Sequence, residues 1–312
     1  MKLGMRIHYR LTVERFGNRE GLFRMSQSTH LHDTIRDIAQ QSAEDRIAHL
    51  RKDRWVDYPI AERALARLEI LLETPRRTRM PCLLIYAESG MGKTMIAEKF
   101  LRAHRPVYVA ERGIERIDVL AVQMPPSPSQ NRFYGEILTA LEAPYRPSDR
   151  LFAVETVALS LLRDLKPRII IVDEVHHLLA GSPREQRASL NLLKFLANKL
   201  QCAIVALGTM EARAAMQTDA QMNSRFKPVE LPRWRDGDVF RAFVKTFEQL
   251  LPLREPSRFA NQQFAREILR RGGGITGNIT ELLVQAAELA LRTDRESVTL
   301  EMLEEVAGVA VA

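Results

Sequence analysis

A short glycine-containing segment, Ala87 to Thr94, has the residue types and spacing that hold the phosphates of a nucleotide. It reads Ala-Glu-Ser-Gly-Met-Gly-Lys-Thr, which is the P-loop pattern with Ala87 in place of the usual first glycine. Backbone amides of such a loop point at phosphate oxygens. The Lys93 ammonium would bridge the β and γ phosphates, and the Thr94 hydroxyl would ligate magnesium. ATP and Mg²⁺ are therefore the expected cofactors, and the expected nucleotide-binding residues of the loop are Ser89, Gly90, Met91, Gly92, Lys93 and Thr94.

A second chemical signal is a pair of acids at the end of an apolar run. Residues 168–172 predict a buried strand, and Asp173 and Glu174 follow it directly. Asp173 would hold the magnesium ion through water, and Glu174 would deprotonate the attacking water. The alternative is that the two acids only end a strand and cap the next helix. A P-loop upstream favours the catalytic interpretation.

Two histidines, His176 and His177, come next. A metal site would need further ligands at suitable spacing, and the nearby sequence suggests none. We expect the pair at the start of a helix near the nucleotide.

These residues need a sheet to position them. Strand-like and helical segments alternate up to about residue 232, which predicts a mostly parallel sheet covered by helices on both faces. Only helical patterns follow Pro232, so a smaller helical lid domain is expected there. The predicted domains are an N-terminal extension over 1–55, an α/β nucleotide-binding domain over 56–232 and the lid over 233–312. The expected strands are 82–86, 107–110, 119–122, 168–172 and 202–207, and the expected helices are 33–52, 61–73, 94–104, 133–142, 153–165, 184–199, 236–250, 261–271, 278–292 and 300–307.

Composition narrows the choice of partners. The chain has 312 residues and a formal net charge of +7, which favours nucleic acid or another polyanion. No apolar run approaches the roughly 20 residues that cross a bilayer, so no membrane partner is expected. The two cysteines, Cys82 and Cys202, fall in predicted strands. Reduced thiols and a cytoplasmic location are the simplest expectation.

Further residues resemble elements of AAA+ ATPases. Thr209 ends the predicted strand 202–207 and its glycine turn, where AAA+ proteins carry a polar group that contacts the γ-phosphate or the lytic water. Asn223-Ser224-Arg225-Phe226 resembles the element that supplies an arginine finger to a neighbouring subunit. Thr280 stands where many AAA+ lids carry an arginine. Thr209 and Arg225 are thus implied to act in catalysis beside Glu174, and the fold implied is a P-loop AAA+ sheet with a C-terminal helical lid.

The flanking sequence is more specific, and it resembles the TniB family of bacterial transposition proteins. Tyr58-Pro59, Arg79-Met80-Pro81 and the stretch Asp173 to His177 carry the resemblance, which covers roughly residues 30–290. TniB is similar to TnsC, an AAA+ regulator of transposons. The resemblance implies a homo-oligomeric ring or filament on double-stranded DNA that recruits a TniA/TnsB-like transposase and a TniQ-like target-selection protein. ATP hydrolysis would disassemble it.

Some assignments stay open at this level. Arg112, Arg116 and Arg132 are candidate contacts to the DNA backbone, or solvated surface charges. Tyr58 could stack on adenine, or pack in a core. The alternative functions are a nucleotide-dependent scaffold with slow turnover, or another AAA+ ATPase of the clamp-loader or secretion type.

Overall fold

The strand before the phosphate loop, β1 (Cys82–Tyr86), lies inside a five-stranded sheet in the computed structural model, which describes residues 29–109 and 114–309. The strand order is β4 (Val119–Gln123), β5 (Ile169–Asp173), β6 (Ala203–Gly208), β1 and β7 (Phe226–Glu230). All four strand pairs are parallel, so the carboxyl ends of the strands meet at one edge. The predicted parallel sheet is therefore confirmed.

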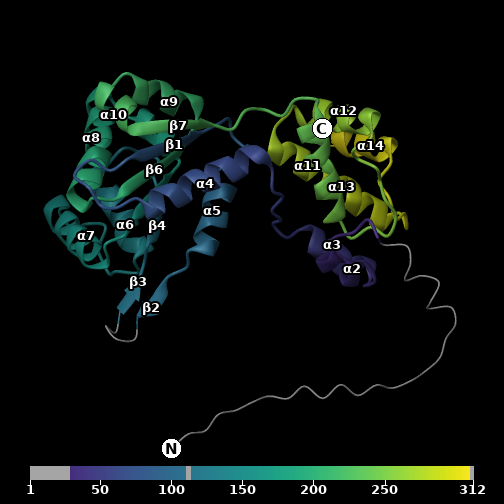
Figure 1. The fold of residues 1–312 in the computed structure, drawn as a ribbon, viewed down its shortest axis with the longest axis horizontal. Helices are drawn as coiled ribbons and strands as arrows, with labels where there is room; N and C mark the ends of the chain where they lie inside the picture. The colour runs from purple at the N-terminus through teal and green to yellow at the C-terminus, as the bar shows by residue number, and fades with distance from the viewer. Residues whose placement is uncertain (1–28, 110–113, 310–312) are drawn as a thin grey trace, which may run out of the picture.

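Helices cover both faces of this sheet (Figure 1). Leu83 and Ile85 of β1 belong to one hydrophobic core, and Cys82, Leu84 and Tyr86 belong to another. Because successive strand side chains point to opposite faces, the two cores lie on opposite sides of the sheet. The first core includes helices α4 (Pro59–Glu73) and α5 (Lys93–Ala103). The second includes α6 (Gln130–Ala140), α7 (Leu151–Leu165) and α8 (Pro183–Leu200).

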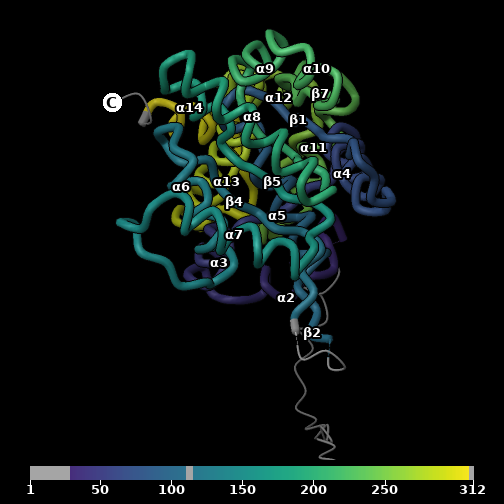
Figure 2. Tube along the Cα trace, turned by 90° about the vertical axis from the view of Figure 1, so that its left-hand side faces the viewer, coloured from purple at the N-terminus to yellow at the C-terminus, as the bar shows by residue number. Residues whose placement is uncertain are grey.

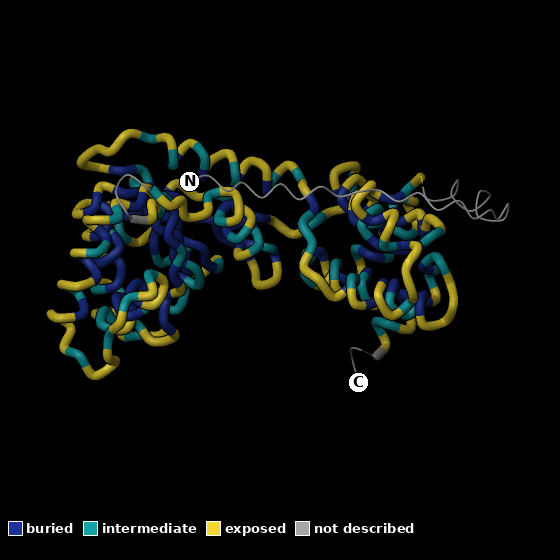
Figure 3. The backbone as a smooth tube through the Cα atoms, turned by 90° about the horizontal axis from the view of Figure 1, so that it is seen from below, coloured by how far each residue is buried: buried dark blue, intermediate teal, exposed yellow. Residues whose placement is uncertain are grey.

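A second lobe is purely helical and contains the predicted C-terminal helices. They are α11 (Asp238–Gln249), α12 (Gln262–Gly272), α13 (Thr276–Arg292) and α14 (Leu300–Val309). Figure 3 shows the buried residues gathered in two groups, one in each lobe.

Two N-terminal helices, α2 (Asp33–Ala39) and α3 (Ala43–Leu50), lie against this helical lobe (Figure 1). Ile47 and Leu50 share its core, and the buried Arg46 guanidinium makes two hydrogen bonds to Glu296, at 2.7 and 3.0 Å. Such a buried charge needs this partner, because an isolated one would cost several kcal/mol. The chain therefore runs between the lobes twice, once after α3 and once after β7.

The sequence patterns missed several elements. The strand β7 pairs with β1 at the edge of the sheet, but Pro228 and an exposed, polar surface hide its pattern. The helices α9 (Met210–Gln217) and α10 (Ala220–Arg225) are too short to show a clear period. The predicted helix over 33–52 is two helices, because Ser42 caps a new start through the Asp45 amide.

A β-hairpin of β2 (Val107–Val109) and β3 (Ile114–Arg116) projects from the sheet lobe (Figures 1 and 2). Strand β3 was not predicted. Arg112 falls between the two strands, outside the described residues, as does the beginning of the predicted N-terminal extension. Among the helices of residues 29–109 and 114–309, none is long and apolar enough to cross a membrane.

Candidate nucleotide-binding site

The phosphate loop joins the carboxyl end of β1 to the start of α5 at Lys93. Gly90 and Gly92 have φ values of 76° and 88°, which side-chain-bearing residues rarely adopt. Ala87 has replaced the usual glycine without strain of this kind, and its amide donates to the Gly208 carbonyl of β6 at 3.1 Å. The loop thus presents its backbone at the edge where the strands end, next to the N-terminus of a helix.

Lys93 lies against this loop and is largely buried. Its Nζ donates to the carbonyl oxygens of Ala87 and Glu88, at 3.2 and 3.0 Å. Burial lowers the pKa of Lys93, while the nearby carboxylates of Glu174 and Asp173 oppose that shift. The two hydrogen bonds hold the ammonium close to the loop. Phosphate oxygens bound there would be stronger partners for it than the carbonyl oxygens.

Thr94 and Asp173 meet although they lie on different elements. The Thr94 hydroxyl donates to Asp173 Oδ2 at 2.7 Å. A hydroxyl and a carboxylate are the oxygen donors that Mg²⁺ prefers in P-loop proteins. The residues present therefore fit a magnesium ion at this place.

Glu174 follows Asp173 in a strained conformation. Its φ is 53°, in the left-handed region, and its amide donates to Asp173 Oδ1 at 2.7 Å. Non-glycine residues in this region are concentrated at functional sites. Gly208 lies close by, and a side chain there would meet Val175 at 2.7 Å. Position 208 therefore needs a glycine so that the turn containing Glu174 and Val175 can pack against β6.

A cavity of about 580 Å³ adjoins the loop and extends between the two lobes. This volume is within the usual range for small-ligand sites. Its wall is formed by the phosphate loop, by Glu174, by residues 50–56 and 58, and by the helical lobe. The helical lobe contributes Thr276, Gly277 and Thr280. The Gly277 amide donates to the Gly90 carbonyl at 2.8 Å, so the start of α13 touches the phosphate loop directly.

Tyr58 lines this cavity and also packs in a core. Its ring centroid is 5.0 Å from that of Trp234 and 5.9 Å from that of Phe243. Burial raises the pKa of Tyr58 to about 12, so the hydroxyl stays protonated at neutral pH. Contact of Tyr58 with adenine remains a prediction.

Thr209 and Arg225 lie outside the cavity wall. Thr209 directly follows β6 and precedes α9, and β6 lies between β1, which leads into the phosphate loop, and β5, which leads into Glu174. Arg225 ends α10, and its Nη1 donates to Asn198 Oδ1 at 2.7 Å. The next residue, Phe226, pairs with Cys82 at the amino end of β1. That end of a five-residue strand is roughly 13–17 Å from the phosphate loop, so Arg225 cannot serve the site of its own chain.

The candidate DNA-contacting arginines are dispersed. Arg116 of β3 forms an ion pair with Asp118 at 2.7 Å, which offsets its charge. Arg132 lies in the first turn of α6, and its Nη1 donates to Ser127 Oγ at 3.2 Å. The part of the chain that the structure describes does not bring these two arginines into contact, so their role on DNA stays a prediction.

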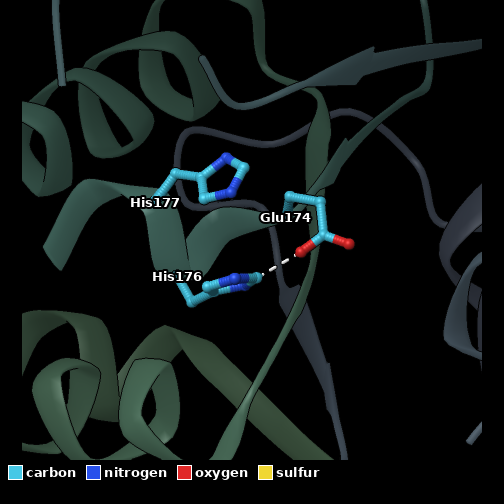
Figure 4. Close-up of side chains that lie close together, drawn as sticks. All are labelled: Glu174, His176 and His177. Carbon is cyan, nitrogen blue, oxygen red and sulfur yellow. Dashed lines mark ion pairs between the residues drawn. The ribbon is translucent and has the colours of Figure 1, made fainter. Parts of the chain in front are cut away.

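The two histidines lie in a 3₁₀ helix, η1 (Val175–Ala180), as the sequence suggests. The nearby sequence suggests no further ligand for a metal ion, but the structure places one more group that could act as a ligand beside the two histidines. Glu174, His176 and His177 each place a ligand atom within 4.8 Å of the others (Figure 4). The place of Glu174 at the end of a strand indicates a catalytic acid, so the sequence pattern does not mark it as a third potential ligand. The His177 amide donates to the Glu174 carbonyl at 2.9 Å, a 3₁₀ turn that places positions 174 and 177 on one side.

Comparisons with known proteins agree with this architecture. A family model described as "Bacterial TniB protein" matches residues 46–236, more than half of the chain. No curated protein matches the chain.

Solved structures are similar at low sequence identity. The chain is 18% identical to the Aeropyrum pernix ORC1 protein in complex with DNA, with a TM-score of 0.61, covering 85% of this chain and 69% of that one. It is 14% identical to CDC6P from Pyrobaculum aerophilum, with a TM-score of 0.60, covering 83% of this chain and 69% of that one. It is 15% identical to the Aeropyrum pernix ORC2 protein in ADPNP-ADP complexes, with a TM-score of 0.56, covering 83% of this chain and 71% of that one. The fold is thus that of P-loop AAA+ proteins with a helical domain.

Proposed function

Because the chain belongs to the TniB family, we propose that it is a magnesium-dependent ATPase that assembles on target DNA and recruits a transposase. The Thr94–Asp173 contact of 2.7 Å, directly beside the phosphate loop, carries the ATPase part of this proposal. Family membership over residues 46–236 carries the transposition part.

The proposed reaction uses groups that line the cavity, Lys93, Thr94 and Glu174, together with Asp173 and Thr209 at the ends of the neighbouring strands. The loop amides and Lys93 bind the phosphates, while Thr94 and Asp173 hold the magnesium ion. Bound Mg²⁺ neutralises part of the phosphate charge. Glu174 lines the cavity and accepts the proton of the attacking water. Thr209 orients that water or contacts the γ-phosphate from the end of β6.

The proposed partners follow from the family and from charge. Double-stranded DNA fits a net charge of +7, and one similar structure is a DNA complex. Arg112, Arg116 and Arg132 are the proposed backbone contacts. A TniA/TnsB-like transposase and a TniQ-like target-selection protein are the proposed protein partners. Buried free thiols at Cys82 and Cys202 fit a cytoplasmic protein.

Electron microscopy with duplex DNA tests this proposal. In ATP or a slowly hydrolysed analogue we expect rings or filaments on the DNA, and in ADP we expect none. Raising the salt concentration should weaken assembly steeply, because phosphate contacts release counterions. Absence of DNA-dependent assembly in both nucleotides would refute the DNA part of the proposal and leave an ATPase that acts on protein partners.

Arg225 provides a test of the homo-oligomer. Because it lies at the far end of β1, we propose that it completes the site of a neighbouring subunit, where it stabilises charge on the γ-phosphate. Arg225→Ala and Glu174→Gln should each be inactive alone. Mixed in equal amounts they should regain activity, since random mixing joins an intact Glu174 to an intact Arg225 at about a quarter of interfaces.

The control for this mixing experiment is a chain that carries both substitutions. Mixed with Arg225→Ala, it supplies no arginine and should restore no turnover. Full activity of Arg225→Ala alone would show that the neighbour contributes no such residue.

A second candidate function rests on Thr280. It lines the cavity, and its hydroxyl donates to the Gly277 carbonyl at 2.9 Å, where AAA+ lids often present an arginine. Without that arginine the lid has a weaker means of sensing the γ-phosphate. A nucleotide-dependent scaffold with slow turnover would have this property, and turnover rates measured with and without DNA distinguish the two.

A further inference from the structure

Glu174 and His176 make a contact that needs either a proton or a metal ion between the two atoms. His176 Nδ1 lies 3.0 Å from Glu174 Oε2 (Figure 4). This nitrogen is buried and makes no aligned hydrogen bond with a described residue. If it carries only a lone pair, it faces a carboxylate oxygen at a distance where two acceptors repel. Either a proton or a metal ion between the two atoms resolves the conflict.

His177 is prepared as a metal ligand. Its Nδ1 lies 2.9 Å from the Met124 carbonyl oxygen, which can only accept a hydrogen bond. Nδ1 therefore carries the proton, and the other ring nitrogen, Nε2, keeps its lone pair. Histidines that bind metals commonly donate their second ring nitrogen to a carbonyl in this way, which fixes the tautomer and the ring orientation.

The spacing and exposure of the three groups suit one ion. Ligand atoms around a tetrahedral or octahedral transition metal lie roughly 3.0–3.5 Å apart, given bonds of about 2.0–2.2 Å. The Glu174–His176 contact already has that spacing, and all three ligand atoms lie within 4.8 Å of one another. The side chains of Glu174 and His176 are 34% and 30% exposed, so the cluster lies near the surface although the His176 Nδ1 atom itself is buried.

We propose that Glu174, His176 and His177 bind a divalent transition metal such as Zn²⁺ or Co²⁺, and that the bound metal inhibits ATP hydrolysis. Two imidazoles and one carboxylate favour these ions over Mg²⁺, which prefers oxygen ligands. The site is thus chemically distinct from the Thr94–Asp173 pair. A metal that holds the Glu174 carboxylate removes it from the cavity as a proton acceptor. The inhibition rests on the proposed function of Glu174, whereas the binding does not.

Binding is tested on the full chain without nucleotide. We expect Co²⁺ to give a visible d–d absorption band that saturates at one ion per chain, and Zn²⁺ to abolish the band by displacement. His177→Ala should weaken Co²⁺ binding at least about tenfold, since loss of an outer-shell partner alone costs about that much and His177 is a proposed direct ligand. His176→Ala should do the same. The matched control is His104→Gln, which removes a histidine beside a single glutamate, Glu69, at 2.9 Å and should leave the band unchanged.

Inhibition is measured separately, as ATP turnover at fixed Mg²⁺ with increasing Zn²⁺. We expect loss of activity at the concentrations that saturate the site, and resistance of His177→Ala to at least tenfold higher Zn²⁺. Absence of a saturable band in the unsubstituted chain would overturn the proposal, and His176 would then carry a proton and only orient Glu174. A band without any ATP turnover in metal-free protein would instead refute the proposed catalytic function and leave the metal site standing.

Discussion

Alanine in place of Lys93 is expected to abolish ATP binding and, with it, assembly on DNA. The Lys93 ammonium is the buried positive charge of the phosphate loop, and alanine leaves the phosphates without it. Loss of one partner of a buried charged pair costs about 2–5 kcal/mol, so ATP affinity should fall roughly 30- to 4000-fold. Equilibrium binding of a fluorescent ATP analogue measures this loss, and electron microscopy with DNA measures assembly.

Arg102→Ala is a suitable control for the loss of a cation from the same helix. Arg102 is exposed and pairs with Glu98 at 2.8 Å, which contributes little to stability. It should bind ATP and assemble as the unsubstituted chain does. ATP-dependent DNA binding that persists in Lys93→Ala would contradict the mechanism, because assembly would then not need the phosphate loop.

Glutamine in place of Glu174 is expected to stop hydrolysis and keep ATP bound. The amide has the size of the carboxylate but does not accept the proton of water. Loss of a general base lowers turnover by about 100-fold or more. ATP affinity should change little, because Lys93 and the loop remain. The assembly on DNA should therefore persist in ATP for as long as nucleotide stays bound, and dissociation after dilution measures its lifetime.

A doubly substituted chain, Lys93→Ala with Glu174→Gln, separates binding from hydrolysis in that experiment. It should fail to assemble, since the second change acts only after ATP has bound. Rapid dissociation of Glu174→Gln from DNA in ATP would count against Glu174 as the base and would direct attention to Thr209.

Residue types could predict the central sheet because its strands are short apolar runs with turns at their ends. β1, β5 and β6 are buried on both faces and are therefore apolar along their length, apart from Asp173 at the end of β5. β7 could not be found in this way, because an edge strand with Pro228 is polar and half exposed. Sequence patterns also do not show which helices pack together when they lie far apart in the chain. Nothing in the local pattern of Ile47 and Leu50 says that they join the core of the C-terminal helices.

In the candidate site, too, some features follow from local sequence motifs and others depend on contacts between distant parts of the chain. Lys93, Thr94 and Asp173 belong to motifs whose spacing is set by one loop and one strand end, and the structure brings them together. The contact of Gly277 with Gly90 depends on how two lobes meet, and no motif records it. The cluster around Glu174 is not visible in the sequence either, because the His177 ring is oriented by the Met124 carbonyl, which lies far away along the chain.

The two passages of the chain between the lobes have a mechanical consequence. A lid held by a single tether can swing and twist in any direction, but two attachments define an axis. Here the segments after α3 and after β7 are both covalent, and Arg46 ties the first of them to the lid through Glu296. Residues 50–56 on that first segment also line the cavity. A nucleotide in this cavity would therefore touch the first of the two segments, and we expect the two attachments to favour rotation of the lobes about the axis that they define.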